Sequence, residues 1–506
     1  MKINKIIAGL FVATMFVSCF DDESSVADLS SLSEITIVEG SINKEYNIQR
    51  NETLTISPSF TQSNVEKPLK YTWEVDLEPY SYEKDFLYVG NKLGSYNCRL
   101  IVENEDGKTF FPFKLNVNSP YEEGITVLSA DTEGRPMLSF MQTPADKNEV
   151  GTFTTAELLT LNNDDIYFSS NPSDMLHSDA TLFIACKGSD TQGDLPAVYY
   201  LNEKTFIVEN MFTVPEYPAF KPQKLLIPTS YTNYVLPLYI LSDDGSIYNF
   251  TVTQAALEPS PKFAYKYAMA THMDDSNGAY YSLVMWDNEA HALVNAYNGG
   301  YGPYYLGPIR HTDRATAMEK AENNYFAGLD FVTMVTVRAT DAQKRLDGNE
   351  IIVLTKKGIM AYRTIVESSF WDRDDVGKYY MLVDKNKPSM VNLGGTLSID
   401  EHTPCIASKT YLTMFFAEGN KVRKWNYTTS QMLSAASTHL TVGSDDAVIT
   451  GFEMSADQKT TYVAFYEPTQ EGKNGSVWAF DTDKGTVLNK WENISYKPVK
   501  MIYKYK

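Results

Sequence analysis

Short apolar stretches alternate with polar turn sequences along most of the chain. Between residues 35 and 116 these stretches are rich in β-branched and aromatic residues, and turn chemistry such as Glu105-Asp106-Gly107-Lys108 separates them. This pattern predicts short strands of an antiparallel β-sandwich. The predicted strands cover residues 35–38, 53–57, 71–75, 96–103 and 110–116.

After Ser119-Pro120 the pattern becomes a series of repeated units, each with an apolar strand, a polar turn and a second strand that ends in aromatic residues. The units cover residues 197–208, 236–252, 281–297, 351–365, 412–427 and 461–491. Most unit starts are about 40 to 60 residues apart, which is the repeat length of four-stranded propeller blades. Such units bury their faces only against neighbours, so a closed ring is expected.

The two ends of this repeated region are expected to share one blade, formed by residues 125–141 and 499–505. Six internal units and this closing blade suggest about seven blades, although six or eight fit nearly as well. A chain of further immunoglobulin-like sandwiches is the competing fold, but no second linker rich in Pro, Gly and Ser follows residue 120. Residues 313–324 contain good helix formers and predict a helix inserted at one rim. The expected fold class is therefore all-β.

The N-terminus has the pattern of an export signal. Lys2 and Lys5 precede an apolar run over residues 6–17, which is too short to span a membrane as a helix. Ser18-Cys19 then resembles the lipobox of bacterial lipoproteins, although Phe16 stands where Leu is usual. The resemblance implies that residues 1–18 are removed and that Cys19 becomes lipidated. An ordinary signal peptide with an incidental cysteine is the alternative.

An acidic run, Asp21-Asp22-Glu23, follows Cys19 and resembles the signal that carries Bacteroidetes lipoproteins to the outer face of the outer membrane. Residues 19–33 would then form a flexible tether behind the lipid anchor. The expected localisation is a lipid-anchored position on the cell surface, in the outer membrane.

Composition narrows the class of partner. The 506 residues include 64 acidic and 44 basic side chains, a formal net charge of −20. Such a charge repels phosphates, so no nucleic-acid partner is expected. Cys98, Cys186 and Cys405 form no metal-binding spacing and are expected to be buried thiols. No cofactor and no metal site are predicted, although calcium binding is left open.

Two sequence blocks carry a resemblance to a known family. Tyr71-Thr72-Trp73-Glu74 and residues 96–107 resemble the PKD-like immunoglobulin-type module, with Trp73 as its core tryptophan. The junction at residues 121–129 and 135–140 resembles PKD-like surface lipoproteins of Bacteroidetes, which carry a β-propeller-like body. The resemblance implies a PKD-like domain over residues 34–119, a propeller over residues 120–506, and an accessory role beside SusC/SusD-type nutrient importers.

No nucleophile elbow, P-loop or dinucleotide-binding motif is present, and the chain is expected not to be an enzyme. Asp372, Asp374 and Asp375 form the sharpest acidic cluster, but a solvated loop accounts for it more simply. A propeller glycoside hydrolase or lyase is the alternative function.

Two segments are expected to be exposed loops that could bind a sugar, since they place aromatic rings beside polar groups. They cover residues 298–305 and 370–380. Ordinary rim packing is the plainer interpretation, and the tryptophans at 286, 425, 478 and 491 are assigned to blade cores. The candidate ligand-binding residues are Tyr301, Tyr304, Tyr305, Arg310, Trp371, Asp372 and Arg373.

These features predict an accessory of a SusC/SusD-like, TonB-dependent import system that binds a glycan or peptide without catalysis. A purely structural subunit that docks on the transporter is a further alternative.

Overall fold

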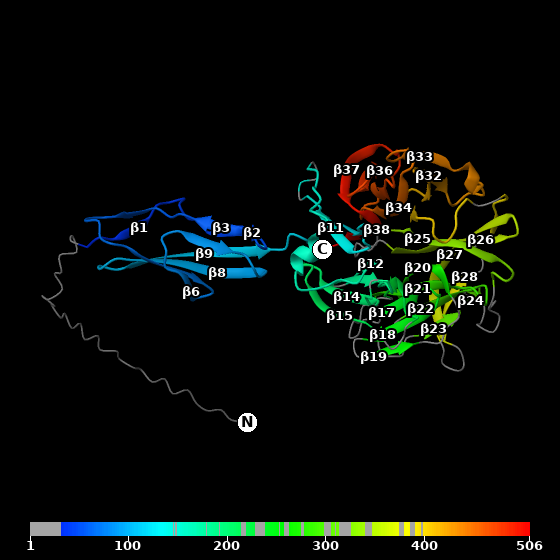
Figure 1. Cartoon of the computed structure of the whole chain (residues 1–506), viewed down its shortest axis with the longest axis horizontal. Coiled ribbons are helices and arrows are strands. Elements are labelled where there is room, and N and C mark those ends of the chain that lie inside the picture. Colours follow the sequence, from blue (N-terminus) through cyan, green and yellow to red (C-terminus); the bar gives the residue numbers. More distant parts are fainter. Residues whose placement is uncertain are drawn as a thin grey trace, which may run out of the picture. The chain divides into compact units, whose positions relative to one another are not determined.

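The computed structural model divides the chain into two compact units, Met1–Ser119 and Pro120–Lys506 (Figure 1). It describes residues 32–505, except 145, 147–148, 179, 192, 214–218, 228–237, 252–253, 258–262, 275–277, 298–304, 309, 313–324, 340–346, 374–378, 385–389 and 396–397. Cys19 and the predicted helix at 313–324 therefore lie outside the described residues.

The N-terminal unit consists of three small sheets. A five-stranded sheet has the order β2-β9-β8-β5-β6, in which β2 runs parallel to β9 and the other pairs are antiparallel. Two further pairs, β1-β4 and β3-β7, are antiparallel. The strands are β1 (Ile35–Ile37), β2 (Glu45–Gln49), β3 (Thr53–Ile56), β4 (Phe60–Gln62), β5 (Lys70–Val75), β6 (Glu78–Ser81), β7 (Phe86–Val89), β8 (Gly94–Glu103) and β9 (Lys108–Asn118).

Trp73 forms the centre of this unit's core, as the period-two pattern around it predicted. Its side chain is fully buried and stacks on Phe86, with ring centroids 4.7 Å apart. The indole Nε1 donates a hydrogen bond of 3.0 Å to the carbonyl oxygen of Glu83, so the one polar atom of the ring is satisfied. Phe86 comes from β7 and Trp73 from β5, and the contact therefore holds two sheets together.

The second unit is nearly all strand, with a propeller-like succession of sheets. In the part of the chain that the structure describes, its strands fall into seven groups, most of them with four antiparallel strands in sequence order. The groups are β10 (Gly124–Ala130), β11 (Pro136–Gln142) and β38 (Lys497–Lys504); β12 (Pro172–Ser178), β13 (Thr181–Cys186), β14 (Ala197–Asn202) and β15 (Val208–Phe212); β16 (Pro222–Leu226), β17 (Leu238–Ser242), β18 (Ile247–Thr251) and β19 (Gln254–Leu257); β20 (Phe263–Asp274), β21 (Gly278–Asp287), β22 (Ala292–Tyr297) and β23 (Tyr305–Pro308); β24 (Arg310–Thr312), β25 (Asp330–Arg338), β26 (Asp347–Lys357), β27 (Met360–Arg373), β28 (Tyr379–Asp384) and β29 (Val391–Asn392); β30 (Cys405–Ser408), β31 (Thr413–Glu418), β32 (Lys421–Asn426) and β33 (Ser437–Thr441); and β34 (Val448–Met454), β35 (Thr460–Tyr466), β36 (Gly475–Asp481) and β37 (Val487–Ser495). A short helix α1 (Leu158–Asn162) and a 3-10 turn η3 (Leu433–Ala435) accompany them.

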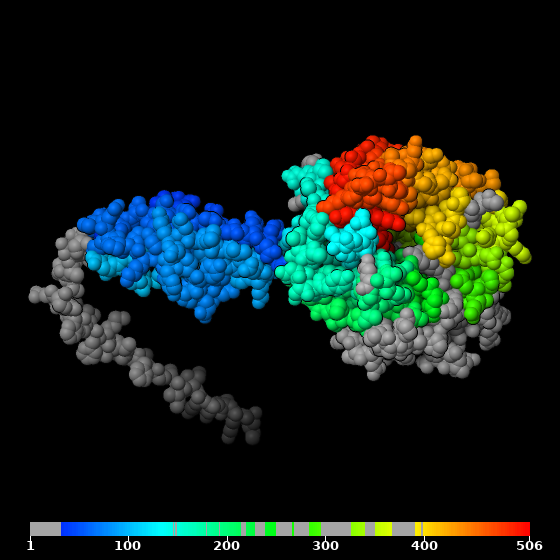
Figure 2. All heavy atoms as spheres, viewed as in Figure 1, coloured from blue at the N-terminus to red at the C-terminus, as the bar shows by residue number. Residues whose placement is uncertain are grey.

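The last strand closes this unit. As the sequence predicted, β38 pairs antiparallel with β10, which in turn pairs with β11. β38 also contacts β12 and β34, the first strands of the groups on either side. In Figure 2 the red C-terminal residues lie against the cyan residues that follow position 120. The two ends of the repeated region therefore contribute to one sheet.

Each predicted hairpin of the second unit is present, because alternating apolar positions pack against the neighbouring groups. Trp286, Trp425 and Trp478 are buried as predicted, whereas Trp491 is half-buried. Cys98 and Cys186 are also buried, and burial raises the pKa of both thiols. Cys405 departs from the expectation. It is only half-buried, because its strand β30 begins there and borders a cavity.

Candidate functional site

A cavity of 440 Å³ opens where four connections meet at one end of two neighbouring strand groups. Because antiparallel strands alternate in direction, the β21–β22 and β26–β27 turns lie at the same end as the starts of β20 and β25. The register confirms this, since Asp287 pairs with Phe263 and Asp330 pairs with Lys356. The lining residues are Trp286, Asn288, His291, Asp330, Phe331, Val332, Lys356, Gly358, Ile359, Ala361, Gly395, Ile399, Asp400 and Glu401.

Aromatic stacking supports the cavity from below. The half-buried Phe331 stacks on Trp286, with ring centroids 5.3 Å apart and an interplanar angle of 29°. Trp286 is 1% exposed and packs edge to face against Phe326. A large ring held by two others has little freedom to rotate, so Phe331 offers a stiff apolar surface.

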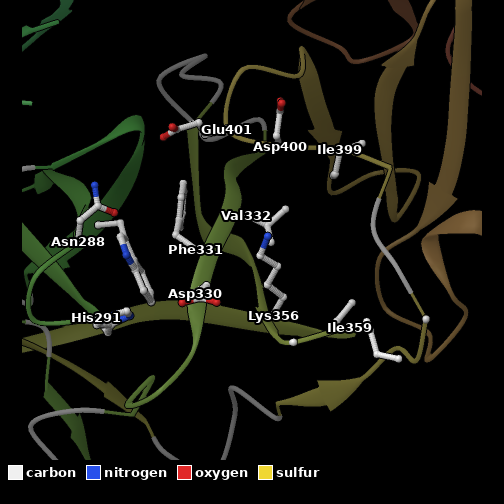
Figure 3. A pocket seen from close by; sticks show the side chains of 14 residues that line it. Asn288, His291, Asp330, Phe331, Val332, Lys356, Ile359, Ile399, Asp400 and Glu401 are labelled. Carbon is white, nitrogen blue, oxygen red and sulfur yellow. The ribbon is translucent and has the colours of Figure 1, made fainter. Parts of the chain in front are cut away.

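Polar side chains surround the Phe331 ring. Figure 3 shows Asn288 and His291 on one side of it, Lys356 on the other, and Asp400 and Glu401 above. Asn288 lies in a tight turn in which Asp287 Oδ1 accepts the backbone N–H groups of residues 289 and 290, at 2.8 and 2.9 Å. This closure fixes the position of the Asn288 amide at the cavity edge.

His291 links the two strand groups that form the cavity. Its Nδ1 lies 2.7 Å from the carbonyl oxygen of Leu329, one residue before β25. A carbonyl oxygen only accepts, so Nδ1 carries the proton and donates it. In the neutral ring Nε2 is then an acceptor at the cavity wall.

Asp400 is held in one orientation by its own turn. Its Oδ1 accepts the N–H groups of His402 and Thr403, each at 3.0 Å, and the hydroxyl of Thr403 at 2.9 Å. These hydrogen bonds, that of the Thr403 side chain first, lower the pKa of Asp400 below its usual value. Asp400 is therefore a carboxylate near neutral pH and an acceptor for hydroxyl groups.

The cavity thus combines one stiff aromatic face with an amide, an ammonium group and carboxylates. Asn288, Lys356, Asp400 and Glu401 together supply both donors and acceptors. A ligand with an apolar face and several hydroxyl groups would match this arrangement, because each hydroxyl both donates and accepts. Within the described residues, no three His, Cys, Asp or Glu side chains gather closely enough to hold a metal ion.

The residues predicted from sequence to bind ligand do not line this cavity. Tyr301 and Tyr304 lie outside the described residues. Tyr305 and Arg310 lie in the strands β23 and β24. Trp371, Asp372 and Arg373 lie at the end of β27.

The expectation of a loop at residues 370–373 is wrong. Apolar Phe370 and Trp371 extend β27, where they pair with Leu382 and Met381 of β28. Arg310 pairs with Leu382 from the other side of β28. One sheet therefore brings the two predicted segments to either side of the same strand, although the sequence placed them on loops of neighbouring blades.

Sequence reasoning missed the cavity residues because they looked like ordinary hairpin turns. Asp287-Asn288-Glu289 and Lys356-Lys357-Gly358 were both recognised as turns between paired strands. Their charged and amide side chains gave the only signal, and such side chains are common in turns. The folding of two strand groups side by side is what makes them neighbours.

In the described part of the chain, no helix has the length and apolar character needed to cross a membrane. Neither models of known protein families nor curated protein sequences give a match to this chain.

Solved structures give matches at low identity. A quinoprotein alcohol dehydrogenase-like protein from Bacteroides thetaiotaomicron is 14% identical, with a TM-score of 0.45, over 93% of this chain and 99% of that protein. A periplasmic gluconolactonase from Pseudomonas aeruginosa is 12% identical, with a TM-score of 0.41, over 75% and 98%. A candidate 6-phosphogluconolactonase from Bacteroides uniformis is 10% identical, with a TM-score of 0.41, over 76% and 99%.

These matches correct the expectation that the chain is not an enzyme. Two of the three proteins are described as lactonases, so chains similar in fold to this one include hydrolases. The absence of a nucleophile elbow or nucleotide-binding motif was the basis of the expectation, and a propeller needs neither motif to catalyse hydrolysis. At 10 to 14% identity the likeness concerns the fold and assigns no reaction to this chain.

Proposed function

We propose that this chain is a lipid-anchored protein of the cell surface that captures carbohydrate in the cavity around Phe331, for uptake through a SusC/SusD-like, TonB-dependent importer. The observation that carries the proposal is the Phe331 ring, stacked on the buried Trp286 and bordered by Asn288, Asp400 and Glu401. In this proposal the second unit is a seven-bladed propeller and the first is a PKD-like module that acts as a spacer.

The chemistry of a sugar ring supports this ligand class. Its axial C–H groups form an apolar face that packs on an aromatic ring, and its hydroxyl groups need acceptors around the edge. Phe331 supplies the first requirement, while the carboxylate of Asp400 and the amide of Asn288 supply the second. The cavity volume of 440 Å³ falls within the usual range for small-molecule sites.

Replacement of the aromatic ring tests the site directly. We expect Phe331→Ala to weaken oligosaccharide binding about tenfold or more, since the stacking surface is lost while the polar groups remain. Isothermal titration calorimetry with oligosaccharides chosen from a glycan array measures the change. Phe110→Ala is the matched control, because Phe110 is 52% exposed on the other unit.

Equal affinity of the wild-type protein and Phe331→Ala would contradict the assignment of this cavity. The same oligosaccharides, recovered after incubation with the protein, show by chromatography whether they were cleaved. Cleavage that is lost in Asp400→Asn would assign the cavity to a glycoside hydrolase instead of a capture site. No bound sugar at all would favour the docking role.

The anchor has a separate test. We expect Cys19→Ser to move the protein from the membrane fraction to the soluble fraction, since the thiol is the atom that would be acylated. Cell fractionation followed by immunoblotting measures the distribution, and Ser25→Ala in the tether is the control. If Cys19→Ser stays in the membrane fraction like the control, the lipoprotein assignment is wrong.

A further inference from the structure

A second cavity, of 370 Å³, follows the centre of the strand ring in the second unit. Its described lining comes from the strands that begin six of the groups and from the closing strand β38. We call it the central channel. Its lining residues are Met175, Leu176, His177, Lys224, Lys266, Tyr267, Met334, Val335, Thr336, Arg338, Cys405, Ile406, Phe452, Glu453, Lys500, Met501, Ile502, Tyr503 and Tyr505.

The charge of the central channel is opposite to that of the chain. Lys224, Lys266, Arg338 and Lys500 line it, against the single carboxylate of Glu453, so the described lining carries four positive charges minus one negative, or +3. The whole chain carries −20. The four cations stand on β16, β20, β25 and β38, so only the closed ring gathers them.

The carboxylates that face these cations do not cancel the excess. Glu453 lies 3.4 Å from Arg338, and the buried Asp174 lies 3.6 Å from Lys500. Both distances exceed the usual length of a charged hydrogen bond. Lys266 donates a bond of 3.0 Å to a carbonyl oxygen, that of Thr403.

His177 adds one more group to this balance. It lies 2.7 Å from Glu203, a carboxylate just outside the lining. Counting Glu203 and Asp174 together with Glu453 leaves four cations against three carboxylates, with His177 neutral. The positive excess therefore persists in the enclosing shell.

A cavity whose low-dielectric walls carry one sign of charge concentrates small ions of the other sign. The acidic exterior makes this contrast stronger, because an anion finds few other favourable positions on the protein. At 370 Å³ the channel lies near the lower limit of small-molecule sites, which suits a ligand with one sugar ring. Tyr267 and Phe452 supply aromatic surface in the same wall.

We propose that the central channel is a binding site for a small organic oxyanion, a sugar that bears a carboxylate or a phosphate group. This site is separate from the cavity around Phe331, since the two share no lining residue. The cations of β16, β20 and β25 face the anionic group, and the aromatic side chains pack on the ring. The proposal does not depend on the carbohydrate site at Phe331.

Calorimetry at low ionic strength with glucuronate, glucose 6-phosphate and glucose tests this site. We expect both anions to bind and glucose not to compete with them, and the stronger anion identifies carboxylate or phosphate as the recognised group. The variant Lys224→Gln/Lys266→Gln should weaken anion binding about tenfold or more, because two cations are removed and no carboxylate loses a printed partner. High ionic strength should weaken binding in the wild type.

The control variant is Lys421→Gln/Lys459→Gln, which makes the same charge change at exposed positions and should bind as the wild type does. Lys266→Arg keeps the charge and should retain the affinity, which separates loss of charge from loss of fold. Phe331→Ala should also retain it. Equal anion affinity in wild type and in Lys224→Gln/Lys266→Gln, or no anion binding by the wild type, would overturn the proposal.

Discussion

A chain that ends at Tyr496, and so lacks β38, is expected to have no stably folded second unit. β38 pairs with β10 from Lys497 to Lys504 and contacts both β12 and β34. Its loss would expose Val127 and Met501's other buried neighbours to water and leave the N–H and C=O groups of β10 without partners. In a ring of repeated units, each group is buried only by its neighbours, so the opening weakens the whole ring.

Differential scanning calorimetry and limited proteolysis measure this effect. We expect the unfolding transition of the second unit to disappear and the unit to be digested rapidly. A chain that ends at Lys504 keeps β38 and is the control, with a transition close to that of the full chain. A chain ending at Tyr496 that unfolded cooperatively near the wild-type temperature would show that ring closure contributes little.

Lys504→Met is expected to stabilise the protein at pH 7, because it removes a cation from an apolar site. The Lys504 side chain is almost fully buried, near the rings of Phe140 and Phe206. Its Nζ donates a hydrogen bond of 2.7 Å to the carbonyl oxygen of Glu203. Burial lowers the pKa of this lysine from 10.5 to about 8, although the Glu203 carboxylate opposes the shift.

The sign of the pH dependence follows from the lowered pKa. Between about pH 8 and 10.5 the unfolded chain holds this proton and the folded chain does not, so the stability of the wild type rises with pH across that window. Below pH 8 the full cost of the buried charge is present, roughly 3 kcal/mol from the shift. The gain from Lys504→Met is therefore largest at pH 7, about 1–3 kcal/mol after the Glu203 carbonyl loses its donor.

Denaturant unfolding of the wild type and Lys504→Met at pH 7 and pH 10 tests this prediction. The difference in unfolding free energy should shrink from the lower to the higher pH, which cancels the titration of all other groups. Lys497→Met is the matched control on the same strand, where the lysine is exposed. A constant difference at both pH values would mean that Lys504 does not titrate as its burial indicates.

Local patterns accounted for much of the fold. The alternation of apolar and polar positions around turns such as Asp287-Asn288-Glu289 predicted the hairpins, because that alternation directly reflects which face of a strand is buried. The pattern also predicted that residues 125–141 and 499–505 would share a sheet, and they do. Strands such as β6 and β7 were missed, since their burial depends on distant strands.

The site was less accessible to sequence reasoning. Loops rich in aromatic residues were expected to bind ligand, yet Trp371 continues a strand because its apolar neighbours and β28 complete a sheet. Asn288, Phe331 and Asp400 are far apart in the sequence, and none of them belongs to a motif. They line one cavity only because two strand groups lie next to each other.

The sequence by itself determined the all-β character of the chain, its strand spacing and its hairpin turns, because these depend on residues close together along the chain. It also carried the total charge of −20, but not the distribution of that charge. The tertiary structure alone decided that Lys224, Lys266, Arg338 and Lys500 meet in a positive channel and that Phe331 stacks on Trp286. The physical reason is that such contacts form between strands brought together by ring closure, which no local pattern encodes.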